Sequence, residues 1–139
     1  MRSHFRIVAF GDSMTECAAL AGFPVHDLPS AEQAARVLLQ RGVKQVVIKM
    51  GEHGAYVHAG AGGELIPGFP VQAVDTTAAG DAFNGALAVA LRKGLALRAA
   101  LRFANACGAL SATRYGAQPS MPTAAEVDDF LKNEKRAQG

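Results

Sequence analysis

The sequence predicts an α/β layered fold, in which short strands alternate with helices around a sheet. Three observations carry this prediction. The length of 139 residues is that of one ordinary domain. Half of the residues are hydrophobic and 19% are charged, which suits a packed interior. Short apolar, β-branched runs alternate with longer segments whose apolar residues recur at helical spacing.

Glycines mark the predicted helix ends in the first part of the chain. Residues 5–10 predict a short strand, and residues 14–21 predict a helix that ends at Gly22. Ser30, with a glutamine three residues later, predicts a capping box for a second helix that Gly42 closes. The buried face of this helix is expected to hold Ala31, Ala34, Ala35, Leu38 and Leu39.

The middle of the chain predicts short strands. Residues 44–50 are an apolar, β-branched run typical of a strand buried on both faces. The glycine-rich residues 51–63 predict a turn and a hairpin tip around a strand at 55–58, with a return strand at 64–66. A further short strand is expected at residues 71–74.

The last part predicts three helices, over residues 80–93, 97–113 and 124–133. Gly94 ends the first of them, and a capping box of Thr123 and Glu126 begins the third. Residues 116–122 are expected to form a loop, and residues 134–139 a polar tail.

Composition argues against several classes of protein. The net charge of +2 is too small for a nucleic-acid groove, and 6% aromatic residues without Trp provide no base-stacking platform. Cys17 and Cys107 make no disulfide framework and suggest a reducing cytosol. No segment is long and apolar enough for a signal peptide or a membrane span. We therefore expect a cytoplasmic protein that binds neither nucleic acid nor membrane.

The chemistry is expected in residues 73–85, AVDTTAAGDAFNG. Ala78, Ala79 and Gly80 are small residues at the start of a helix, where free N–H groups and the helix dipole favour an anion such as phosphate. Asp81 follows in the first turn, where a carboxylate can accept a proton from an attacking hydroxyl. Spacing alone leaves a plainer alternative open, in which Asp81 only stabilises the helix end and Gly80 eases packing.

This segment resembles the D-T-x-[GA]-A-G-D signature of the ribokinase (PfkB-type) family of sugar and nucleoside kinases. Residues 46–54, VVIKMGEHG, resemble the family's strand and nucleotide-binding turn, and residues 101–122 resemble its following helix and cation loop. The resemblance covers residues 15–131, which is the C-terminal part of a ribokinase. It implies a ribokinase-like layered fold with a sheet flanked by helices.

The resemblance also implies roles. Asp81 would be the catalytic base that activates a sugar hydroxyl, and the backbone of Ala78, Ala79, Gly80 and Asp81 would form the anion hole. ATP with Mg²⁺ would be bordered by Ser13, Glu16, Lys49, Met50, Gly51, Glu52, His53, Gly54 and Asn105. A monovalent cation, potassium, would be surrounded by Asp75, Thr77, Ser111, Arg114, Gly116 and Ser120. Without the resemblance, Ser111, Arg114 and Ser120 are typical of helix-end and loop hydrogen bonding.

The sequence departs from the family in two places. Family members are about twice as long, and their N-terminal half supplies most of the sugar contacts. In the family's N-x-x-E element, Glu16 matches the acid but Ser13 stands at the Asn position. We therefore expect a truncated sugar kinase over residues 15–133, preceded by a divergent strand and turn at residues 1–14. A nucleotide-binding module without catalysis is an alternative.

A second alternative concerns Ser13. Residues 6–16, RIVAFGDSMTE, resemble the first block of the SGNH (GDSL-type) esterases, in which this Ser would be the nucleophile. No His follows His58, so that family's C-terminal Asp-x-x-His is missing, and the base would come from His4, His26, His53 or His58. A turn and N-cap made by residues 11–13 is the plainer interpretation.

The sequence also suggests self-association. A strand at residues 44–50 that is apolar on both faces needs cover, and an open strand edge invites pairing with another chain. We therefore expect a homodimer or a swapped oligomer, with a nucleotide and a sugar as the small-molecule partners. No cluster of His, Cys and acidic residues has zinc-ligand spacing.

Overall fold

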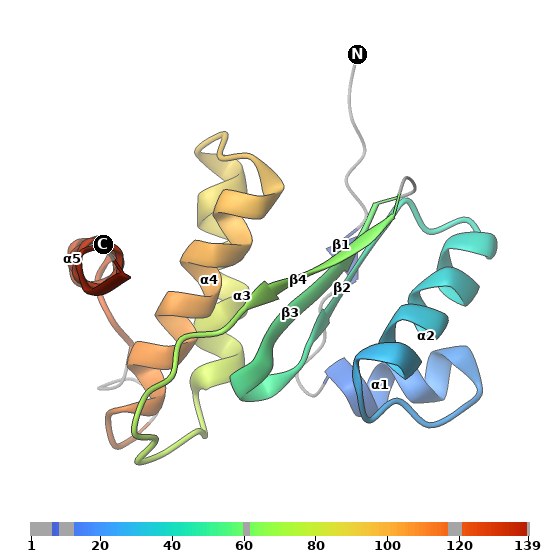
Figure 1. Cartoon of the computed structure of the whole chain (residues 1–139), viewed down its shortest axis with the longest axis horizontal. Helices are drawn as coiled ribbons and strands as arrows, with labels where there is room; N and C mark the ends of the chain where they lie inside the picture. The colour runs from blue at the N-terminus through green and yellow to red at the C-terminus, as the bar shows by residue number, and fades with distance from the viewer. Residues whose placement is uncertain (1–6, 9–12, 60–61, 117–120, 139) are drawn as a thin grey trace. The chain divides into compact units, whose positions relative to one another are not determined.

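The computed structural model describes residues 7–8, 13–59, 62–116 and 121–138. Its contacts divide the chain into two compact units, Met1–Ile66 and Pro67–Gly139 (Figure 1). The division falls where Pro67, Gly68 and Pro70 follow one another closely, a composition that is common at boundaries between compact units. Each unit is therefore described by itself.

The first unit is built on a four-stranded sheet with strand order β1-β2-β3-β4. The strands are β1 (Ile7–Val8), β2 (Gln45–Lys49), β3 (Gly54–His58) and β4 (Gly63–Pro67). β1 runs parallel to β2, whereas β3 is antiparallel to β2, with Ile48 opposite Tyr56. The strands predicted at residues 44–50, 55–58 and 64–66 are confirmed. β1 lies inside the strand predicted at residues 5–10, whose other residues lie outside the described part of the chain.

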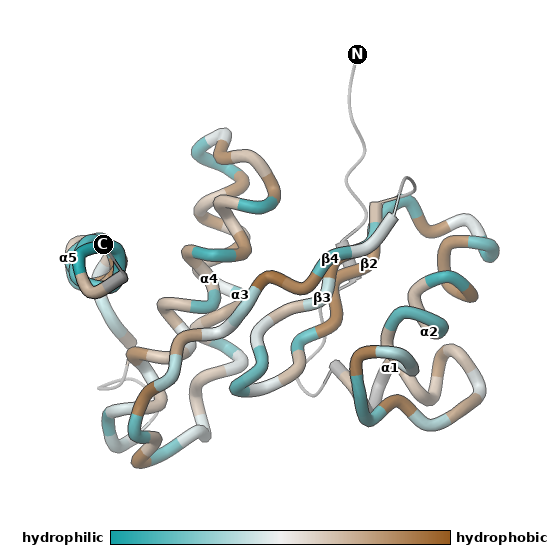
Figure 2. Tube along the Cα trace, viewed as in Figure 1, coloured by the Kyte–Doolittle hydropathy of each residue, from teal (hydrophilic) through white to brown (hydrophobic). Residues whose placement is uncertain are grey.

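Two helices, α1 (Ser13–Ala21) and α2 (Leu28–Gln40), pack against the sheet of this unit. The predicted face of α2 is confirmed, because Ala31, Ala34 and Ala35 are completely buried in a core that includes Ile48. Teal and brown alternate along α2 in Figure 2, as expected for a helix with one buried face. Val47, whose side chain projects from the opposite face of β2, is only 2% exposed. The prediction of a strand buried on both faces is therefore confirmed.

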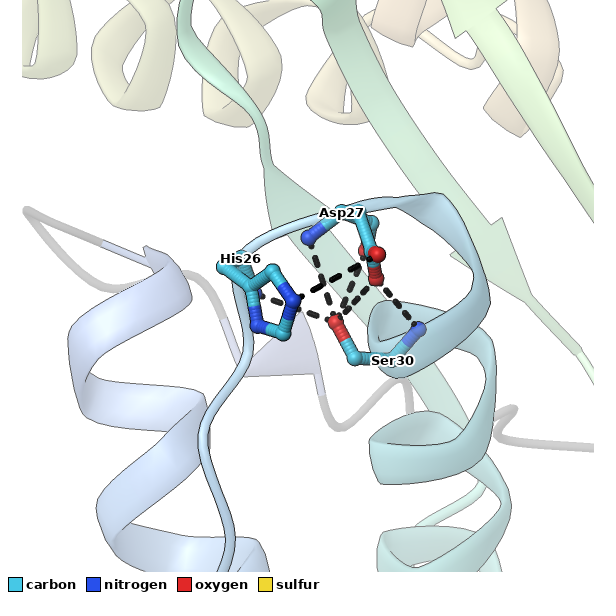
Figure 3. Close-up of polar contacts among 3 residues, drawn as sticks. All are labelled: His26, Asp27 and Ser30. Atoms are coloured by element: carbon cyan, nitrogen blue, oxygen red, sulfur yellow. Dashed lines mark hydrogen bonds and ion pairs between the residues drawn. The ribbon is translucent and has the colours of Figure 1, made fainter.

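The start of α2 corrects a prediction. The N-cap is Asp27 rather than Ser30, and Ser30 is the third residue of the helix (Figure 3). The Ser30 N–H donates to Asp27 Oδ1 at 2.9 Å, and the Asp27 N–H donates to Ser30 Oγ at 3.1 Å. Pro29 is compatible with this earlier start. The N–H groups in the first turn of a helix have no hydrogen-bond partner within the helix, so the N–H that proline lacks is not missed there. The capping box is real, but it begins three residues before the predicted position.

The second unit consists of α3 (Ala79–Arg92), α4 (Leu97–Ala112) and α5 (Ala124–Gln138). All three predicted helices are confirmed, and α4 packs against both α3 and α5. Gly94 ends α3 as expected, with a left-handed φ of 87° that disfavours other residues. α5 is largely hydrophilic in Figure 2 and continues through residues 134–138, where the sequence predicts a polar tail.

Residues 71–74 form no strand in the described structure, and this prediction is wrong. The N–H groups of Val74 and Asp75 instead donate to the carbonyl of Ala112 at 2.8 and 3.1 Å. That carbonyl is at the last residue of α4, where the helix itself leaves carbonyl groups without a partner. The segment is therefore held by a helix end rather than by a neighbouring strand.

No helix within the described residues is both long enough and apolar enough to cross a bilayer.

We predict that Asp27→Ala lowers the melting temperature at pH 7, because α2 loses its cap. Its hydrogen bonds with Ser30 hold the pKa of Asp27 below its ordinary value. A carboxyl with a lowered pKa stabilises the fold above its unfolded pKa, and this contribution is lost as the pH falls through the folded value. The difference in melting temperature between the two proteins should therefore shrink below about pH 4. Asp27→Asn, which still caps, is the control. A difference that does not change with pH would contradict this account.

Candidate active site

The start of α3 presents a helix N-terminus surrounded by small residues. Ala78 is the N-cap, and no side chain among the described residues caps the helix. The Ala79 N–H donates to the Thr76 carbonyl at 3.2 Å, and the first intrahelical bond runs from Ala82 to Ala78 at 2.9 Å. The first turn therefore combines uncapped N–H groups, the positive end of the helix dipole and side chains that leave room for an anion.

Asp81 lies in this first turn, and its residue is exposed. A carboxylate is favourable there because it faces the positive end of the helix dipole. Its exposure leaves it accessible to a ligand. The sequence prediction that an acid accompanies the anion site is consistent with this arrangement.

Gly108, on α4, brings the two helices close together at the start of α3. A Cβ atom added at Gly108 would lie 3.2 Å from the Ala79 carbonyl oxygen, which is a tight contact. The Ala79 carbonyl and the Gly80 N–H belong to the same planar peptide unit. A side chain at position 108 would therefore press on the peptide unit that carries an amide of the candidate anion hole. Sequence reasoning missed this residue, because a glycine inside a helix gives no indication of which backbone it approaches.

Asp75 ties the turn before α3 to the loop after α4. Its Oδ1 accepts the Thr77 N–H at 2.9 Å and the Thr77 hydroxyl at 2.5 Å, and its Oδ2 accepts the Gly116 N–H at 3.1 Å. These donors hold the pKa of Asp75 below its ordinary value, with the Thr77 hydroxyl as the largest cause. The carboxylate therefore stays ionised at neutral pH.

The residues predicted around a monovalent cation are partly brought together. Asp75, Thr77 and Gly116 are joined by hydrogen bonds, and Ser111 is fully buried near the end of α4. The Arg114 guanidinium instead binds Glu126 on α5 at 3.0 Å, so only its backbone is available to a cation. Ser120 lies outside the described residues. Within the described part of the chain, no group of three or more His, Cys, Asp or Glu side chains could hold a metal ion.

The predicted nucleotide turn lies in the first unit, between β2 and β3. Lys49 ends β2, Met50 is buried, and a short 3₁₀ helix spans Gly51–His53. The Met50 N–H donates to the Gly54 carbonyl at 2.8 Å, and Gly54 has a φ of 106°, which favours glycine. The turn is therefore tight and leaves Gly51, Glu52 and His53 exposed.

The remaining predicted nucleotide residues lie on helices. Ser13 and Glu16 belong to α1, and their side chains lie outside the described part of the structure. Asn105, on α4 in the second unit, is 8% exposed and donates from Nδ2 to the Pro67 carbonyl at 3.2 Å. The Asn105 amide thus holds the segment that leads toward Asp75.

His26, Asp27 and Ser30 contain the side chains of a hydrolytic triad but do not have its arrangement (Figure 3). His26 Nε2 lies 3.5 Å from Asp27 Oδ2, while the Ser30 hydroxyl lies 2.5 Å from Asp27 Oδ1. A triad needs the imidazole between the serine and the acid. Here the acid lies between them, and the His26 and Asp27 side chains are 73% and 50% exposed. The cluster is the capping box of α2.

Comparison with known proteins gives a consistent result. The family described as pfkB family carbohydrate kinase matches residues 13–124. The ribokinase of Haemophilus influenzae is 43% identical over 119 residues, which cover 86% of this chain and 39% of that protein. The structure of Arabidopsis thaliana ribokinase complexed with ribose and ATP has a TM-score of 0.81 at 37% identity, again over 86% of this chain and 39% of that one.

A more distant solved structure is similar over the same region. A double mutant of the fructokinase from Vibrio cholerae, with fructose, ADP and potassium ion bound, has a TM-score of 0.75 at 29% identity, over 85% of this chain and 38% of that one. These similarities confirm the predicted fold class. The chain spans about two fifths of the length of these relatives.

We predict that two helical glycines respond differently to alanine. A Cβ at Gly85, in α3, meets nothing within 4 Å, so Gly85→Ala should stabilise the protein by roughly 0.5–1 kcal/mol through reduced backbone entropy. Gly108→Ala should give a smaller gain or a loss, because its Cβ presses on the Ala79 carbonyl. Urea unfolding measures both, and equal gains would contradict the proposed close contact.

Proposed function

This chain belongs to the pfkB family of carbohydrate kinases, and from that premise we propose that it carries out ATP-dependent phosphoryl transfer to a sugar hydroxyl. The observation that carries the proposal is the uncapped start of α3, where small residues and Asp81 share one helical turn. Backbone amides there can stabilise the charge on a transferring phosphoryl group, and positioning with electrostatics supplies most of the catalysis in this reaction class.

The proposed roles follow from the chemistry of the first turn of α3. The backbone from Ala78 to Asp81 forms the anion hole. Asp81 is the catalytic base, because its exposed carboxylate can accept the proton of the attacking hydroxyl as the new P–O bond forms. The bond from the γ-phosphorus to the bridging oxygen breaks, and ADP leaves.

The substrates are proposed from the relatives. The solved Arabidopsis ribokinase holds ribose and ATP, and the solved fructokinase holds fructose and ADP. For this chain we propose ATP as the phosphoryl donor and a sugar such as ribose as the acceptor. The exposed turn at Gly51–His53, with Lys49, Met50 and Gly54, is proposed as a nucleotide-binding segment of the first unit. Asn105 is proposed separately as a nucleotide-binding residue of the second unit.

Two cations are part of the proposal. Mg²⁺, when bound, neutralises charge on the nucleotide phosphates, and Ser13 and Glu16 are the residues proposed beside it. For potassium, the oxygen donors at Asp75, Thr77 and Gly116 fit a hard cation, since the carboxylate is ionised and the turn is already held together. Ser111, Arg114 and Ser120 are proposed to complete this site through oxygen atoms, for which the Arg114 guanidinium is unsuited.

Self-association and the cytoplasm stay predictions. The strand expected to need a partner, β2, is buried within the single chain, with Val46, Val47 and Ile48 at most 2% exposed. The argument for a homodimer or swapped oligomer therefore rests on β1 and β4, the outermost strands of the described sheet. Light scattering after size exclusion distinguishes a dimer from a monomer.

We predict that Asp81→Asn reduces sugar-dependent ADP formation by about 100-fold or more, the usual contribution of a general base. The variant should still bind ATP in calorimetry, because the backbone amides remain. Asp129→Asn, at an exposed acid on α5, is the matched control and should keep full activity. An Asp81→Asn variant with full activity would refute the assigned base. ATP binding without turnover in the unmodified chain would favour a nucleotide-binding module instead.

The esterase alternative is tested separately at Ser13, which lies within the family match and begins α1. We expect any cleavage of nitrophenyl acetate to be unchanged in Ser13→Ala, because the helix start supplies a structural reason for a serine there. Loss of hydrolysis in this variant would support the alternative.

A further inference from the structure

Arg114 joins the loop after α4 to the start of α5. Its guanidinium donates to Glu126 Oε1 at 3.0 Å and to Oε2 at 3.4 Å. A bidentate ion pair of this kind fixes the relative orientation of the two side chains as well as the distance between them. Glu126 is also held in the capping box of α5, where its Oε2 accepts the Thr123 N–H at 2.6 Å and its own N–H donates to the Thr123 hydroxyl at 3.2 Å. The pair therefore anchors the loop to the ordered first turn of a 15-residue helix.

The anchored loop is the one that contacts Asp75. Gly116 follows Arg114 by two residues, has a left-handed φ of 86° and donates its N–H to Asp75 Oδ2. Two peptide units span at most about 7 Å, so a displacement of Arg114 reaches Gly116 directly. The Arg114 N–H also donates to the Ser111 carbonyl at 3.1 Å, which holds the loop to the end of α4.

Asp75 carries this constraint to the start of α3. Its other carboxylate oxygen accepts both donors of Thr77, and the Thr76 carbonyl accepts the Ala79 N–H. A series of hydrogen bonds, joined by the short backbone segments 114–116 and 76–77, thus runs from the capping box of α5 to the first turn of α3. Every link lies within the second unit.

We infer that Arg114 and Glu126 are positioning residues, which hold the 113–116 loop against Asp75 and so keep the anion-hole turn in place for phosphoryl transfer. This inference rests on the proposed function. The hydrogen bond from the Thr123 N–H, and to a smaller extent that from Arg114, keeps the pKa of Glu126 below its ordinary value. Arg114 and Glu126 are therefore both ionised at neutral pH. Exposed ion pairs contribute little to stability, which allows a positioning role to be separated from a general loss of folding.

The test is Glu126→Gln. Glutamine preserves the capping box but removes the charge that binds Arg114, so the helix start is retained. We expect solvent exchange of the Gly116 amide, measured by NMR, to accelerate at least about 3-fold. We expect kcat to fall about 10-fold with KM for ATP within about 2-fold, because small misplacements near reacting groups reduce the rate strongly. Arg114→Lys keeps the positive charge but cannot form two parallel hydrogen bonds to the carboxylate. Its Gly116 exchange rate and its kcat should therefore lie between those of the unmodified protein and those of Glu126→Gln.

Glu32→Gln is the matched control. Glu32 pairs with Arg36 on α2 at 2.8 Å, and its side chain is 44% exposed, against 45% for Glu126. This control should change neither Gly116 exchange nor kcat. Unchanged Gly116 exchange in Glu126→Gln would overturn the inference, and so would faster exchange with unchanged kcat in an active protein. If the unmodified chain shows no turnover, the proposed function fails, and exchange of the Gly116 amide in Glu126→Gln still decides whether Arg114 and Glu126 hold the 113–116 loop.

Discussion

The carboxylate of Asp75 is the interaction on which the second unit's candidate site depends. It joins two turns that are 41 residues apart in sequence, by accepting hydrogen bonds from Thr77 on one side and from Gly116 on the other. Hydrogen bonds to an ionised acceptor are stronger than neutral ones. Because both turns contribute backbone N–H groups, the loss of this carboxylate would leave each of them without its ionised acceptor.

The packing of α3 on α4 explains why the two turns lie close together. Alanines at positions 100 and 104 are completely buried, and Gly108 lets the backbone of α4 approach the Ala79 carbonyl. The end of α4, which is the negative end of its dipole, therefore lies in the same unit as the positive start of α3. The Ala112 carbonyl at this end accepts the N–H groups that lead into Asp75. Small residues thus determine where the helix ends meet.

The sequence predicts the elements that local chemistry determines and misses those determined by distant partners. Gly42 and Gly94 adopt the left-handed conformation that commonly follows a helix end, so the ends of α2 and α3 could be predicted from the sequence. The strand predicted at residues 71–74 fails, because the partner of this segment is the end of a helix 38 residues beyond Val74, at Ala112. The capping box of Thr123 and Glu126 was predictable from its spacing, whereas its pairing with Arg114 required the fold.

The same contrast holds within the candidate site. Small residues before an acid indicate an anion site at the start of α3, but the sequence does not say what supplies its positive potential. Arg114, the basic residue in the loop that contacts Asp75, is neutralised by Glu126. The Arg114 guanidinium is therefore not available to a phosphate at the start of α3, whereas the backbone amides and the helix dipole there are, and their positions are fixed by the fold. Flexible cations could follow a moving phosphate, whereas fixed amides favour one position of it. The rate of phosphoryl transfer should therefore depend on how accurately this turn is positioned, and hence on the hydrogen bonds that hold Asp75.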